Sequence, residues 1–223
     1  MQVNSSITER LTTVVLHGLI LGLLGGCTSG MSFGQVPDWM VPITLGDFEY
    51  SVPVPPGMRE DCAGDPTRLA QRSAQIADSL TLLACLKTVR GAPTVLDGAV
   101  TVLVADGLKT PDFAAYKQAL RGQVEALTTA MKNARQAGIT PVVDRPRVLK
   151  ILEEGKHWVV HAVARPDEAG NPRVGVVGSV LVRDRLFYLN LLQDGRAKPD
   201  WVALQTLAKD WAHTLIIKNE WRS

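Results

Sequence analysis

The chain has 223 residues, with 24 Lys or Arg against 22 Asp or Glu, so its formal net charge at pH 7 is +2. This near balance argues against a general nucleic-acid-binding protein, which needs a basic surface to contact phosphates. Hydrophobic residues make up 46% and charged residues 21% of the chain, which is typical of a globular protein.

The first 26 residues have the pattern of a bacterial export signal. Arg10 precedes an apolar run that ends at residue 26, which is shorter than the roughly 20 apolar residues that span a bilayer comfortably. The run ends in Leu24-Gly25-Gly26-Cys27, which resembles the lipobox of bacterial lipoproteins. The alternatives are an ordinary signal peptide with an incidental cysteine and an uncleaved membrane anchor.

The lipobox resemblance implies that residues 1–26 are removed and that Cys27 is acylated. Two or more acyl chains anchor a protein stably to a membrane. An aspartate after the cysteine usually signals retention at the inner membrane, and Thr28 stands there instead. We therefore expect an outer-membrane lipoprotein that faces the periplasm, with residues 27–42 as a tether and residues 43–223 as a single globular domain.

Two further cysteines, Cys62 and Cys85, form an even pair in an oxidising compartment. They are either disulfide-bonded or two buried thiols. Residues 65–66, Asp-Pro, are typical of a helix start, and an unbroken helix from there to Cys85 would be roughly 30 Å long. A disulfide needs Cα atoms within about 7 Å. A bridge therefore requires the helix to break near residues 78–79, with residues 80–89 returning.

The middle of the chain predicts two strands and a long helix. Residues 46–54 alternate between apolar and polar side chains, which indicates a half-buried strand, and Pro53 suggests an edge or an end. Residues 99–105 are nearly all apolar and form the centre of a second strand. A helix begins at Thr110 and closes at Gly138. Its apolar stripe consists of Phe113, Tyr116, Leu120, Val124, Leu127, Met131 and Ala134.

The last third predicts a block of strands followed by a helix. The strands cover residues 142–153, 156–165, 173–182 and 185–193, and their short connections make them antiparallel neighbours. Both faces of residues 186–192 are apolar, so the sheet needs cover on both sides. The final helix supplies such cover through Trp201, Leu204, Ala208, Trp211 and Leu215. We therefore predict an α+β fold, a three-layer α/β/α sandwich with a mostly antiparallel sheet.

The chemically active side chains give no strong site. On a strand, His157 and His161 lie about 13 Å apart, too far to share one zinc ion, so we interpret both as surface or partner-bonded histidines. Ser179 lacks the nucleophile elbow of hydrolases, and the glycines around it indicate close packing or a bulge. We expect no catalytic residue, no metal and no cofactor.

Basic residues gather at the turns of the strand block. They can form a basic edge for an acidic partner, a phosphate-bearing lipid or peptidoglycan, or they can be solvated strand ends that discourage edge pairing. We favour the second interpretation. The residues concerned are Arg173, Arg183, Arg185, Arg196 and Lys198.

Two segments resemble PsbP-like proteins. Phe48-Glu-Tyr-Ser-Val-Pro-Val-Pro-Pro-Gly57 is similar to the opening strand of that family, and Arg185-Leu-Phe-Tyr-Leu-Asn-Leu-Leu192 with the helix after it is similar to its end. The resemblance covers residues 46–219, although the insert at residues 60–92 is longer than the family leads us to expect. It implies an α/β/α sandwich that is mostly non-enzymatic and binds or stabilises partners. No binding residue is carried over.

Three functional hypotheses follow. The first is a membrane-anchored, non-catalytic binding or scaffold module of the cell envelope, attached through the lipid on Cys27, with an envelope protein as its partner and no nucleic acid. The second is an envelope immunity or inhibitor protein against a toxic effector. The third is a hydrolase of cell wall or lipid, which would need His157 or His161, a carboxylate and Ser179 to converge in a cleft.

Overall fold

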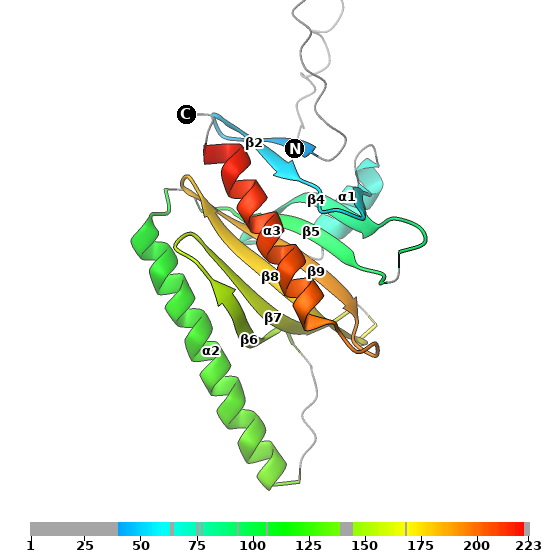
Figure 1. Cartoon of the computed structure of the whole chain (residues 1–223), viewed down its shortest axis with the longest axis vertical. Coiled ribbons are helices and arrows are strands. Elements are labelled where there is room, and N and C mark those ends of the chain that lie inside the picture. The colour runs from blue at the N-terminus through cyan, green and yellow to red at the C-terminus, as the bar shows by residue number, and fades with distance from the viewer. Residues whose placement is uncertain are drawn as a thin grey trace, which may run out of the picture. The chain divides into compact units, whose positions relative to one another are not determined.

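A seven-stranded antiparallel sheet carries the fold, and helices lie on both of its faces (Figure 1). Its strands run in the order β3 (Met58–Glu60), β4 (Leu80–Thr88), β5 (Asp97–Leu103), β9 (Arg185–Asp194), β8 (Pro172–Val182), β7 (Trp158–Pro166) and β6 (Arg147–Glu154). A separate hairpin pairs β1 (Met40–Leu45) with β2 (Phe48–Pro53). The helices are α1 (Pro66–Ser73), α2 (Thr110–Gln136) and α3 (Trp201–Glu220).

The coordinates are a computed structural model. It describes residues 40–62, 65–74, 76, 78–92, 94–105, 107–138, 145–167 and 169–220. The predicted signal peptide, the lipobox and Cys27 therefore lie outside the described residues. None of the described helices is long and apolar enough to cross a bilayer.

Two adjacent residues of β7 show how the three layers arise. Val159 packs in one apolar cluster with Phe113 and Leu120 of α2, whereas Val160 packs in another with Trp211 and Leu215 of α3. Successive side chains of a strand point to opposite faces. The α2 helix and the α3 helix therefore cover opposite faces of the sheet, and the predicted α/β/α sandwich is confirmed.

The last helix is the main cover of the sheet. Its predicted apolar stripe is buried at four of five positions, and Figure 1 shows α3 lying across β8 and its neighbours. The stripe of α2 is used only in part, because its buried residues, Phe113 and Leu120, both lie in the first half of the helix. Met131, farther along, is 43% exposed. The α2 helix is about 40 Å long and packs mainly on the edge strand β6.

The β1–β2 hairpin is fastened to the end of α3 by one side chain. The amide oxygen of Asn219 accepts a hydrogen bond from the backbone N–H of Ser51 at 2.8 Å, and its nitrogen donates to the Ser51 carbonyl at 3.0 Å. Asn219 thus mimics the backbone of a neighbouring strand. Trp211 adds a second link by donating its indole N–H to the carbonyl of Pro53.

A disulfide joins Cys62 to Cys85, with their Cα atoms 5.4 Å apart. Of the two alternatives, the thiols are bridged, and the helix is broken as a bridge requires. The α1 helix ends at Ser73, and the returning segment is strand β4. The side chain of Asp65 caps α1 by accepting a hydrogen bond from the N–H of Arg68 at 3.0 Å.

The start of the folded body differs from the sequence-based expectation. Strand β1 begins at Met40, so the last three residues assigned to the tether belong to a strand. Val41, Ile43 and Leu45 lie against the core on alternating positions. The surrounding prolines and the brevity of the strand hide this period-two pattern in the sequence.

Replacing Asn219 by Leu should lower the free energy of unfolding by about 3 kcal/mol, because two buried backbone groups of Ser51 lose their partners. Denaturant unfolding of the full chain measures the effect. The matched control is Asn133→Leu on the exposed surface of α2, which should change the stability by less than about 0.5 kcal/mol. Equal losses in both variants would contradict the role assigned to Asn219.

Candidate functional site

The predicted basic edge does not form one surface. Arg183 and Arg185 flank the turn between β8 and β9, whereas Arg173 lies at the opposite end of β8 with Arg196 and Lys198. Strand β8 has 11 residues, so the two groups lie about 33 Å apart. Arg183 has a structural use: it lies over the rings of Phe48 and Tyr50 and donates to the carbonyl of Asn219 at 3.1 Å.

The hydrolase constellation named from the sequence is not assembled. Ser179 is fully buried, and its hydroxyl is 2.8 Å from the hydroxyl of Tyr116. His161 stands opposite Val177, two residues along β8 from Ser179. Among the described residues, no group of three or more His, Cys, Asp or Glu side chains is arranged to hold a metal ion.

His161 is 4% exposed, so its interpretation as a surface residue is wrong. Its Nδ1 atom has no hydrogen-bond partner among the described residues. Burial lowers the pKa of His161 to about 4, which keeps the ring neutral near pH 7. The strand is buried on both faces at this position, and a histidine there serves as part of the packing.

The prediction that glycines near Ser179 permit close packing is confirmed at Gly175. A Cβ atom at Gly175 would overlap the carbonyl of Leu191 on the neighbouring strand β9. Only glycine therefore allows the two backbones to approach as closely as they do here.

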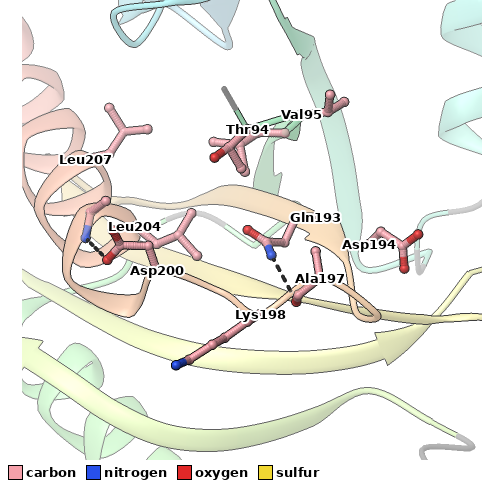
Figure 2. Close-up of a pocket in the computed structure, with 11 residues that line it drawn as sticks. Thr94, Val95, Gln193, Asp194, Ala197, Lys198, Asp200, Leu204 and Leu207 are labelled. Carbon is pink, nitrogen blue, oxygen red and sulfur yellow. Dashed lines mark hydrogen bonds between the residues drawn. The ribbon is translucent and has the colours of Figure 1, made fainter. Parts of the chain in front are cut away.

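A cleft of about 480 Å³ opens where α3 begins (Figure 2). Three chain segments form it: the residues before β5, the end of β9 with the loop after it, and the first two turns of α3. Its walls are mostly apolar. The lining residues are Thr94, Val95, Leu96, Gln193, Asp194, Ala197, Lys198, Asp200, Ala203, Leu204 and Leu207.

Gln193 is the buried polar group of this cleft. The side chain is 4% exposed, and its amide nitrogen donates to the carbonyl of Ala197 at 3.3 Å. Figure 2 shows the amide oxygen on the side away from Ala197. This oxygen can accept a further hydrogen bond. Val95 at the rim is 76% exposed, which leaves apolar surface for an occupant to cover.

Two charged side chains of the cleft, Asp200 and Lys198, differ in what they contact. The carboxylate of Asp200 accepts the N–H of Ala203 at 3.0 Å and so caps α3. Figure 2 shows the Lys198 ammonium pointing away from Gln193. The cleft can therefore hold an apolar group and hydrogen-bond it at one point. Sequence reasoning missed it because residues 94–96 are far in the chain from residues 193–207, and both stretches carry ordinary helix-cap and turn residues.

The buried His161 should make stability depend on pH. The pKa of the ring is about 4 in the folded chain and about 6.5 in an unfolded chain. Between these values the unfolded chain binds more protons, so stability falls as the pH decreases through this window, by at most about 3 kcal/mol. Denaturant unfolding of wild type and His161→Phe across this window should show a shallower slope in the variant. Identical slopes would contradict the assignment.

Comparison with known proteins gives one distant structural similarity. A crystal structure described as a protein of unknown function, PA94 from Pseudomonas aeruginosa, a putative regulator, aligns with a TM-score of 0.33 and 12% identity. The alignment covers 79% of this chain and 94% of that one. No family model matches the chain, and no curated protein matches it. The PsbP-like resemblance therefore stays a prediction.

Proposed function

We propose that the protein is a lipid-anchored binding module of the bacterial cell envelope and that its cleft receives an apolar segment of an envelope partner. The observation that carries the binding role is the cleft itself. Leu96, Leu204 and Leu207 line it, and the amide of Gln193 lies buried within it. Apolar walls with a few placed polar groups are typical of ligand sites.

The envelope address has two independent supports. The lipobox Leu24-Gly25-Gly26-Cys27 is a sequence feature, and the disulfide between Cys62 and Cys85 is a structural one. Disulfides persist in exported proteins and are rare in the cytosol. Both features favour export, and the lipobox favours anchoring at the membrane as well.

A non-catalytic role is favoured by the uses of the reactive side chains. The hydroxyl of Ser179 contacts that of Tyr116 beneath α2, away from the cleft. The carboxylate of Asp200 is occupied as a helix cap. A binding role needs neither group to be free.

The anchor is tested by growth with labelled palmitate. The full chain should incorporate label and sediment with membranes, because acyl chains on Cys27 partition into the bilayer. The variant Cys27→Ala should incorporate none. Labelling of the variant, or an unlabelled wild-type chain, would contradict the anchor.

The cleft is tested by a photo-reactive amino acid at position 95 in living cells. Val95 borders the cleft and is 76% exposed, whereas Val104 follows β5 at its other end and is 56% exposed. Position 95 should yield a discrete adduct and position 104 should not. Adding Ala203→Trp, which fills the cleft, should abolish the adduct. An adduct that forms equally at both positions, or that survives Ala203→Trp, would refute the role of the cleft.

A further inference from the structure

Two arginines face each other across adjacent strands. Arg165 of β7 stands directly opposite Arg173 of β8, with their side chains on the same face of the sheet. Like charges in this position destabilise a sheet. A counter-ion between them would reverse the sign of that contribution.

Arg173 is held in place on one side. Its guanidinium contacts the carboxylate of Asp97 at 2.6 Å, and its Nε donates to the carbonyl of Gln193 at 3.1 Å. A second, longer hydrogen bond of 3.4 Å reaches the carbonyl of Leu192. Asp97 therefore already forms an ion pair with Arg173.

Arg165 is an exposed cation whose side chain makes no ion pair or hydrogen bond with the described residues. Loss of hydration around the guanidinium lowers its pKa, and the charges of Arg173 and Arg72 lower it further, while Asp97 raises it. Arg72 comes from the last turn of α1. Arg165 is therefore a cation beside like charges, which a bound anion would offset.

Two other carboxylates near these arginines are used by turns. Asp167 accepts hydrogen bonds from the backbone of Ala169 and Asn171 at 2.9 Å and 2.8 Å. Asp194 stands opposite Arg173 on β9 and accepts from the backbone N–H of Arg196 at 2.9 Å. Both carboxylates keep their negative charge, and Arg173 acts on Asp167 electrostatically as well. These carboxylates therefore offset the charge of Arg173, whereas Arg165 has no ion pair or hydrogen bond with the described residues.

We propose that Arg165 and Arg173 bind a phosphate group, which belongs either to free phosphate or to a phospholipid headgroup. A planar carboxylate matches one guanidinium fork, whereas phosphate presents several oxygens and can accept from more than one arginine. This site needs neither the lipid anchor nor an occupant of the cleft.

Thermal unfolding of the full chain tests the site. Inorganic phosphate should raise the Tm more than chloride does at equal ionic strength, because it binds the folded state specifically. Arg165→Gln should weaken the apparent affinity at least about tenfold. In phosphate-free buffer this variant should be no less stable than wild type, because it removes a like-charge pair. The matched control is Arg135→Gln on the exposed end of α2, which should keep the full response.

One further ligand, a short-chain phospholipid, separates the two sources of phosphate. If dihexanoyl phosphatidylglycerol and inorganic phosphate both raise the Tm, the site accepts free phosphate. If the lipid alone does so, the ligand is a headgroup. The proposal is overturned if neither ligand exceeds chloride, if acetate is as effective as phosphate, or if Arg165→Gln responds like wild type.

Discussion

The central strands β8 and β9 bury side chains on both faces, and the remaining architecture satisfies this requirement. Val176 and Leu189 need cover from α3, while Leu181 and Leu186 need cover from α2. Each buried side chain of this kind stabilises the folded state by about 1.5–3 kcal/mol. Loss of either helix layer would therefore strongly destabilise the fold. The β1–β2 hairpin extends the cover on the α3 side, and Asn219 satisfies the backbone groups of Ser51 that this arrangement buries.

The cleft and the arginine pair Arg165–Arg173 are linked through strands β5 and β9. Gln193 places its side chain in the cleft, while its backbone carbonyl accepts a hydrogen bond from Arg173. Asp97, the partner of Arg173, follows directly after Leu96, which lines the cleft. Because side chains alternate between the faces of a strand, the ends of β5 and β9 contribute residues to the cleft on one face and contact Arg173 on the other. A displacement of these ends would therefore alter both.

The elements with strong periodicity could be predicted from the sequence, and the meeting points between elements could not. The strands β7, β8 and β9 and the helix α3 follow from apolar patterns and turn residues. The apolar stripe of α2 is buried only in the first half of the helix, because the helix continues past β6, where the described sheet ends (Figure 1). The pairing of Arg165 with Arg173 depends on strand register, and the cleft depends on residues 94–96 meeting the distant residues 193–207. Neither is encoded in a local pattern.

The covalent ring closed by Cys62 and Cys85 encloses α1, and this helix has no buried residue of its own. Its attachment to the sheet therefore relies on the bond at its base and on contacts such as the ion pair of Arg68 with Asp61 at 2.9 Å. Opening the ring would remove the covalent link at the base of α1 and leave this helix, which buries none of its residues, held mainly by surface contacts. In a reducing environment this helix is therefore the part of the described fold that should come loose first.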